Sequence, residues 1–388
     1  MLKIEELHIK GINGINQIDL DFNPGFNFIS GVNGIGKTTI LDCIATTFNR
    51  HSTNVKKNVN NKFGYWSIGA FKDNQYQFEE FYLNEGNENN KKHRFDNEIK
   101  SKEFINFSIN RTSPYKIYYN NAFEYIQNWF YKNYYSSKRL SAKQYSNLKT
   151  AHRCFNLLDS NIQFSQVKVR EDNTSSQVNK NRIAHEFADI YVESNQGEIP
   201  LAYLSAGYKS CLTILLGIIK QTEVTSATKG IDSYEGVILI DELDLHLHPE
   251  WQGRLIEILK WLVPQAQVIA TTHSPHIIQV AGPSEIIPLG YSKEGKTIIR
   301  DVPSNKYGFQ GWSVEEILTD VMGMKNTHSD LYLDTLNEFD VALTNFDREK
   351  AKMLYSRIDK MLHPQNHLRK VYKIQMASLE SVYNDKNT

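Results

Sequence analysis

The chain has 388 residues, enough for one large α/β domain with additions or for two to three small domains, and it can bury a substantial core. Lysine plus arginine and aspartate plus glutamate each number 44, which excludes a global basic field and an acidic tail, so any site for a polyanion must be local. The cysteines lack zinc spacing, the first residues lack a signal-peptide pattern, and no apolar run approaches the roughly 20 residues of a membrane helix. We therefore expect a soluble, cytoplasmic protein with no membrane partner.

The first strands lead into a glycine-rich loop. Strands are predicted at residues 3–9, 18–22 and 26–30, separated by turn-forming glycine, asparagine and proline. Gly-Val-Asn-Gly-Ile-Gly-Lys-Thr follows at 31–38, and apolar residues with helical spacing continue over 38–48. A strand, a glycine-rich loop and a helix in this order are the context of a phosphate-binding loop.

This phosphate loop (residues 31–38) predicts a site for ATP and Mg²⁺. Its glycines let backbone N–H groups converge on the β-phosphate at a helix N-terminus, whose partial positive charge favours the anion. Lys37 would reach the β- and γ-phosphates, and the Thr38 hydroxyl would ligate Mg²⁺. The residues expected to bind nucleotide here are Asn33, Gly34, Ile35, Gly36, Lys37, Thr38 and Thr39.

The middle of the chain differs in composition. Residues 65–82 alternate like antiparallel strands, 84–92 look like a solvated loop, and 123–193 read as an inserted helical subdomain. Residues 125–158 contain no acid, and their cations alternate with aromatic rings. Either the cations hold a nucleic acid backbone while the rings stack on bases, or the rings pack in the core and the cations form an ordinary solvent-exposed face. The cations are Lys132, Lys138, Arg139, Lys143, Lys149 and Arg153.

The second half continues an α/β pattern. Ser205 is placed to cap a helix, and a continuous apolar run at 237–240 is typical of a strand covered on both faces of a parallel sheet. Further strands are expected at 268–271, 285–289 and 297–300, and helices at 251–262, 330–343 and 347–362.

Polar residues follow two of these buried strands. Asp241 ends the first, where a carboxylate is costly unless it is paired, so we expect it to join Thr38 in the metal shell. Glu242 comes next and would orient or deprotonate an attacking water as the catalytic base. His273 follows the next strand, at the carboxyl edge where ligands bind in open α/β sheets.

Two further segments resemble those of ABC-type ATPases. Leu-Ser-Ala-Gly at 204–207 is similar to the ABC signature, and the segment that begins Leu-Asp-Leu-His-Leu-His-Pro at 243–249 resembles the D-loop. The resemblance implies that Ser205 and Gly207 face the γ-phosphate of a nucleotide held by a second subunit. It also implies that Asp244 lies towards that dimer interface.

The same resemblance assigns His273 as the catalytic switch histidine, which contacts the γ-phosphate. The implied fold class is α/β: an ABC-ATPase head, or P-loop NTPase, with an inserted helical subdomain and a C-terminal helical extension. The expected divisions are an ATPase lobe at 1–122, the basic-aromatic insertion at 123–193, a second ATPase lobe at 194–300 and the extension at 301–388.

Over residues 1–289 the chain resembles the AAA/ABC-type ATPases of the overcoming-lysogenization-defect and SMC/RecF-like group, above all the ATPase subunits of Septu-like and retron-associated antiphage systems. The family implies a Mg²⁺-dependent ATPase without nuclease activity of its own, since no acidic Toprim cluster follows His273. It implies a homodimer or higher oligomer joined through ATPase heads, regulating a separate effector nuclease of the HNH type. The family also allows a reverse transcriptase and nucleic acid, either DNA or an RNA–DNA hybrid, as partners.

Several alternatives stay open from the sequence. An SMC/RecF-like ATPase that clamps DNA in repair would show DNA-stimulated hydrolysis without a partner, and a transporter subunit is disfavoured by the long insertion. Gln127 lies in the general region of the ABC Gln-loop, but nothing around it fixes that role. The helices at 330–343 and 347–362 carry more apolar surface than they can hide against each other, so one face covers the ATPase or docks a partner protein.

Overall fold

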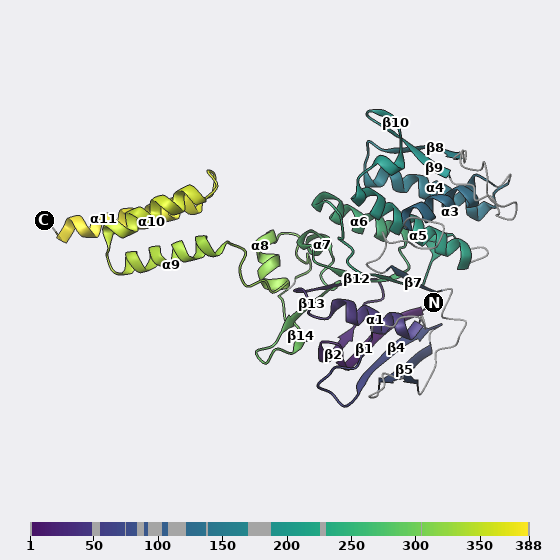
Figure 1. Cartoon of the computed structure of the whole chain (residues 1–388), viewed down its shortest axis with the longest axis horizontal. Coiled ribbons are helices and arrows are strands. Elements are labelled where there is room, and N and C mark those ends of the chain that lie inside the picture. Colours follow the sequence, from purple (N-terminus) through teal and green to yellow (C-terminus); the bar gives the residue numbers. More distant parts are fainter. Residues whose placement is uncertain are drawn as a thin grey trace, which may run out of the picture. The chain divides into compact units, whose positions relative to one another are not determined.

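The computed structural model forms two compact units, Met1–Gly323 and Met324–Thr388 (Figure 1). Each unit is considered by itself. The structure describes residues 2–48, 55–73, 75–83, 89–91, 103–107, 122–136, 139–169, 188–225, 230–303 and 305–386. Within these ranges, no helix combines the length and apolar character needed to cross a bilayer.

A six-stranded sheet organises the first unit. Its order is β14-β13-β3-β12-β11-β7, and neighbouring strands from β13 to β7 are parallel, whereas β14 is antiparallel to β13. The strands are β3 (Phe26–Ser30), β7 (Phe104–Phe107), β11 (Val237–Ile240), β12 (Gln267–Thr272), β13 (Ile286–Tyr291) and β14 (Thr297–Ile299). Every residue of β3, β11 and β12 is buried, and for β11 the continuous apolar run predicted this.

Successive residues of these central strands serve two separate cores. Val237 and Leu239 pack into the core shared with helix α1 (Lys37–Phe48). Ile238 and Ile240 pack into the core that contains the helices of the opposite layer. Figure 1 shows these layers, with α1 and an antiparallel sheet on one side of β12 and the helices α3 to α6 on the other. The antiparallel sheet has the order β2-β1-β4-β5-β6.

The remaining elements of the first unit follow these layers. The antiparallel strands are β1 (Leu2–Ile12), β2 (Ile15–Asp21), β4 (Gly64–Lys72), β5 (Gln75–Leu83) and β6 (Asn89–Lys91). The helices and short helical turns are α3 (Ala122–Tyr134), α4 (Ala142–Leu158), η2 (Leu201–Tyr203), α5 (Ala206–Thr225), η3 (Ile231–Ser233), α6 (Pro249–Leu262), α7 (Pro275–Val280), α8 (Val314–Glu316) and the π-helical turn η4 (Ile317–Val321).

The insertion is helical only in its first part. After α3 and α4 the chain forms β8 (Gln163–Val169), β9 (Ala188–Ser194) and β10 (Gly197–Pro200), paired antiparallel in the order β10-β9-β8. Buried and partly buried residues alternate through the first five residues of β9, which is the period of a strand and not of a helix. The loop expected at 84–92 includes β6, and its residues 84–88 and 92 lie outside the described residues.

The acid-free stretch largely serves internal packing. Phe130 and Tyr134 are core residues, and Lys143 forms an ion pair with Glu223 at 3.2 Å with both side chains below 10% exposed. Lys143 is therefore not available to a nucleic acid in this structure, which corrects the expectation for that residue. Lys138 lies outside the described residues, and the cations that remain on the surface are Lys132, Arg139, Lys149 and Arg153.

The first unit extends beyond the expected boundary at residue 301. Ile317, Val321 and Phe309 share a buried cluster with Ile278 of α7, so the chain up to Gly323 is continuous with the rest of the first unit. The second unit is a helical module of α9 (Asp330–Thr344), α10 (Arg348–Met361) and α11 (Leu368–Lys386). All three helices form one core, in which apolar side chains of α9 and α10 pack against α11. This core includes Tyr332, Phe339, Ala342, Ala351, Leu354, Ile358, Met376 and Leu379.

Candidate nucleotide site

The phosphate loop connects β3 to α1 and depends on glycine backbone geometry. Gly31, Gly34 and Gly36 have φ values of 146°, 76° and 110°, which side chains other than hydrogen rarely allow. A Cβ at Gly31 would lie 2.7 Å from the Leu289 carbonyl oxygen, and one at Gly36 would lie 2.8 Å from Ile15 Cγ1. The loop therefore keeps its backbone concave between neighbouring strands, as a phosphate cradle requires.

Lys37 begins α1 and folds back over this loop. Its Nζ donates to the carbonyl oxygens of Gly31 at 2.9 Å and Val32 at 3.0 Å, and the residue is 6% exposed. Burial lowers the pKa of Lys37 to about 8, and the opposing charges of Asp244, Asp241 and Glu242 limit the shift. A buried cation beside a carboxylate cluster is a site that a phosphate oxygen can complete.

Two hydroxyls meet one oxygen of Asp241 at the end of β11. Thr271 Oγ1 donates to Asp241 Oδ1 at 2.6 Å, and Thr38 Oγ1 donates to the same oxygen at 3.3 Å. Asp241 is buried, and its neighbours are hard oxygen donors. This donor set fits Mg²⁺, which takes one or two protein oxygens together with phosphate oxygens and water.

Glu242 has an unusual backbone at the start of the loop that leaves β11. Its φ is 47°, in the left-handed region that costs a side-chain-bearing residue free energy of about 1 kcal/mol or more. Its N–H donates to Thr271 Oγ1 at 2.7 Å, which holds the residue in that conformation. Thr271 thus contacts both acidic residues, and the sequence signal for this role is a hydroxyl residue near the end of the strand that precedes His273.

Asp244 is bonded to the histidine loop of its own chain. Its Oδ1 accepts from Thr272 Oγ1 at 2.7 Å and from the His273 N–H at 3.0 Å. Burial and then the nearby charge of Lys37 lower the pKa of His273 below its ordinary value, so its ring is neutral near pH 7. Asp244 and the loop that carries His273 are therefore joined by hydrogen bonds within one chain.

The signature segment (residues 204–207) begins α5 and lies beside that same D-loop. Ser205 is exposed, and its hydroxyl accepts from the Tyr208 N–H at 3.2 Å as a helix cap. A Cβ at Gly207 would lie 2.6 Å from the His246 carbonyl oxygen, so only glycine fits this close approach.

An open groove of about 910 Å³ lies over the signature segment. Residues 159–161, 205–207, 246–251 and Arg254 line it. Among the described residues, that lining contains no part of the phosphate loop. The phosphate loop around the buried Lys37 and the groove over Ser205 thus have no lining residue in common.

The other predicted residues fall around these surfaces. Asn33 and Gly34 are exposed at the tip of the loop, whereas Ile35 is a core residue. Thr39 Oγ1 accepts from Asn13 Nδ2 at 3.2 Å. Gln127 is buried in α3, where its Oε1 accepts from the Ile190 N–H at 3.4 Å, so its side chain is used within the insertion.

Comparisons with known proteins place the chain in a family. A family model described as "AAA domain, putative AbiEii toxin, Type IV TA system" matches residues 26–279. Septu protein PtuA of Bacillus thuringiensis is 38% identical over 410 aligned residues, covering 98% of this chain and 100% of that protein. The Retron Vc95 probable ATPase of Vibrio cholerae serotype O1 biovar El Tor is 34% identical over 112 residues, covering 28% of this chain and 21% of that protein. The SMC head domain from Thermotoga maritima matches with a TM-score of 0.48 at 16% identity, covering 78% of this chain and 99% of that one.

Proposed function

The chain belongs to the AAA-domain family and to the family of Septu protein PtuA, and we propose that it is the regulatory ATPase subunit of a bacterial antiphage defence complex. In this proposal ATP closes two heads on each other, and closure controls a partner effector nuclease of the HNH type. The observation that supports it is that the groove over Ser205 is lined by no residue of the phosphate loop. We infer that a nucleotide in contact with both Lys37 and Ser205 is held between two chains.

Lys37 and the loop backbone would bind the β- and γ-phosphates. The buried ammonium would give up its contacts to the Gly31 and Val32 carbonyls for charge-assisted contacts to phosphate. Thr38 and Asp241 would hold Mg²⁺, which when bound neutralises phosphate charge. Asp241 would keep its bond from Thr271, which orients its carboxylate.

Glu242 and His273 would act on the γ-phosphate and its attacking water. Glu242 would accept the proton of that water as the general base. The neutral His273 ring would contact a γ-phosphate oxygen, with its loop held in place by Asp244. Ser205 and the backbone of Gly207 would approach the same phosphate from the second chain, so hydrolysis would require closure.

Removing the Lys37 charge tests the nucleotide site. Lys37→Ala should lower ATP affinity at least about tenfold, because a charge-assisted phosphate contact is worth roughly 1.5–3 kcal/mol. Isothermal titration calorimetry with ATP and Mg²⁺ measures this change. Lys296→Ala, which removes a cation from the exposed turn between β13 and β14, is the matched control and should bind ATP as the unmodified chain does. Equal ATP affinity in the Lys37→Ala variant would overturn the assignment.

Control of the nuclease is tested by reconstitution. The chain and a candidate HNH nuclease should co-purify. Cleavage of DNA by the complex should change when ATP replaces a nucleotide-free buffer. A reverse transcriptase with its nucleic acid product is the further partner that this proposal admits. DNA-stimulated ATP hydrolysis by the isolated chain, with no effect of the nuclease, would instead favour a repair-type DNA clamp.

A further inference from the structure

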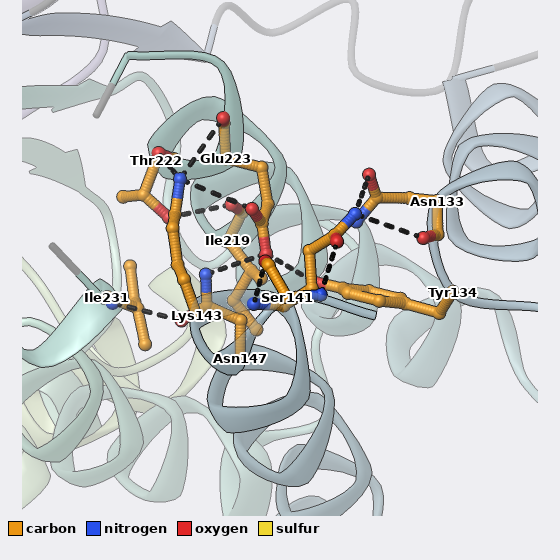
Figure 2. A network of polar contacts seen from close by, with 10 residues as sticks. Asn133, Tyr134, Ser141, Lys143, Asn147, Ile219, Thr222, Glu223 and Ile231 are labelled. Carbon is orange, nitrogen blue, oxygen red and sulfur yellow. Dashed lines mark hydrogen bonds and ion pairs between the residues drawn. The ribbon is translucent and has the colours of Figure 1, made fainter. Parts of the chain in front are cut away.

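A buried polar cluster joins the insertion to the far end of the signature helix α5. Glu223, in the last turn of α5, receives a hydrogen bond from Tyr134 Oη at 3.1 Å and one from Asn147 Nδ2 at 2.8 Å. Lys143 Nζ lies 3.2 Å from the other carboxylate oxygen of Glu223. Figure 2 shows these side chains converging from α3 and α4 on the end of α5.

Lys143 also caps α5 directly. Its Nζ donates to the carbonyl oxygens of Thr222 at 3.0 Å and Glu223 at 3.1 Å. These carbonyls carry the partial negative charge of a helix C-terminus, which a cation stabilises. The side chains of Lys143 and Glu223 are 8% and 7% exposed, so one of them left alone would be a buried unpaired charge.

The same cluster reaches the segment in front of β11. Asn147 is completely buried, and its Oδ1 accepts from the Ile231 N–H at 3.1 Å. Ile231 begins η3, which precedes β11, and Asp241 directly follows that strand. The Asn147 side chain therefore hydrogen-bonds both to Glu223 of α5 and to Ile231, in the segment that leads into β11.

The opposite end of α4 is bonded near the signature segment. The Phe155 carbonyl oxygen accepts from Tyr208 Oη at 2.8 Å, and the Leu158 carbonyl oxygen accepts from Arg254 Nη1 at 2.9 Å. Helix α4 thus runs antiparallel to α5 with polar contacts at both ends. Glu223 and Ser205 are separated by about 27 Å along α5 at 1.5 Å per residue, so only a rigid helix pair can connect them.

We propose that Lys143, Glu223 and Asn147 are positioning residues that hold α5, and with it Ser205, in register with the catalytic end of β11. This inference rests on the proposed function, because Ser205 matters to catalysis only if two heads close on ATP. Buried ion pairs often add little stability compared with apolar residues of similar size, so their value here is the fixed geometry that they impose. A partner bound to the insertion would act on hydrolysis through the same contacts.

The test removes both charges while keeping the neutral hydrogen bonds. In the double variant Lys143→Met with Glu223→Gln, the side-chain amide oxygen at position 223 can still accept hydrogen bonds from Tyr134 and Asn147. ATP affinity of the phosphate loop should stay within about twofold, because the loop is intact. The value of kcat should fall at least about fivefold, because the opposing head is misplaced. The melting temperature should stay within about 4 °C, which separates positioning from loss of fold.

Two further variants sharpen the result. Lys143→Arg keeps the cation and should retain most of kcat. The control double variant Lys260→Met with Glu285→Gln removes another ion pair of the first unit and should leave kcat unchanged. An unchanged kcat in the Lys143–Glu223 double variant, or a kcat that falls only in proportion to the unfolded fraction, would overturn the positioning role. Absence of ATP hydrolysis by the unmodified chain would instead refute the proposed function.

Discussion

At the scale of single residues, Asp244 connects two elements that the sequence resemblance treats separately. The resemblance places Asp244 towards the dimer interface, and the structure bonds it to Thr272 and to the His273 N–H of its own chain. Both contacts need only a carbonyl-type oxygen as acceptor. The charge of Asp244 and its acceptor geometry can therefore be tested separately.

Asp244→Asn should retain ATP hydrolysis within about threefold, because an amide oxygen still accepts both bonds. Asp244→Ala should lose about tenfold or more, since two hydrogen bonds that hold the histidine loop disappear, each worth about 1 kcal/mol. Steady-state kcat at saturating ATP measures both variants. If the two substitutions were equally damaging, the negative charge and not the positioning of His273 would be what matters.

We expect His152 to make the insertion sensitive to acid. Its ring stacks on Phe164 at 4.1 Å, its Nε2 lies 2.9 Å from Tyr135 Oη, and burial lowers the pKa of His152 from 6.5 to about 4. The folded state therefore binds a proton less readily than the unfolded chain. The stability contributed by neutral His152 is complete above pH 6.5 and is lost as the pH falls towards 4.

His152→Phe should reduce this loss while keeping the ring stack. The full shift corresponds to about 3 kcal/mol, and screening at this partly exposed ring brings the expected difference to about 1–2 kcal/mol. Urea unfolding of both proteins at pH 7 and at pH 4.5 gives the comparison. The same pH dependence in both proteins would show that other groups govern the acid response.

At the scale of secondary-structure elements, agreement between sequence and structure follows how local the signal is. The strand at 237–240 matches because its apolar run is continuous, and the strand at 26–30 matches because turn-forming residues precede it and the glycine-rich loop follows it. β8 was missed because most of its residues are exposed, which leaves no apolar alternation to read. α11 was missed because its few core residues matter only once α9 and α10 are present.

The same distinction holds within the nucleotide site. The phosphate loop is contiguous in sequence, so its residues could be named before its geometry was known. The contacts of Thr271 to Asp241 and of Lys143 to Glu223 join residues far apart in the chain. Such pairs depend on how the sheet and helices assemble, and one sequence does not encode them as a local pattern.

Truncation tests the division between the two units. A chain ending at Gly323 should fold and hydrolyse ATP, because the helices α9 to α11 have their own core. A chain ending at Gly311 lacks Ile317 and Val321, which cover Ile278, and should lose about 2–5 kcal/mol of unfolding free energy. Thermal unfolding and ATPase assays compare the two chains, and equal behaviour would contradict the boundary.

The chain that ends at Gly323 also tests partner binding. If α9 to α11 dock the nuclease, the chain ending at Gly323 should hydrolyse ATP but no longer co-purify with it. Exposed apolar residues on all three helices, among them Leu331, Met353 and Ile374, provide a surface for such a contact. Retained co-purification would move the docking surface to the first unit.

At the scale of the whole molecule, the order of motifs along the chain predicted an α/β P-loop fold, and the parallel sheet places their residues at one edge. The D-loop contacts link this edge to α5, since Gly207 abuts the His246 carbonyl and Asp244 bonds the histidine loop. The groove over Ser205 is nevertheless lined by no residue of the phosphate loop. We propose that two chains share each ATP, with the phosphate loop supplied by one chain and the signature segment by the other.

Mixing two inactive variants tests this claim most directly. Lys37→Ala removes the phosphate contact but keeps the signature segment, whereas Ser205→Arg blocks the signature segment but keeps the phosphate loop. Each variant alone should be nearly inactive. A co-expressed mixture should regain roughly a quarter of the unmodified rate, because about half of randomly formed dimers are mixed and each mixed dimer has one complete site out of two. A mixture no more active than the two variants measured separately would contradict a nucleotide site shared between chains.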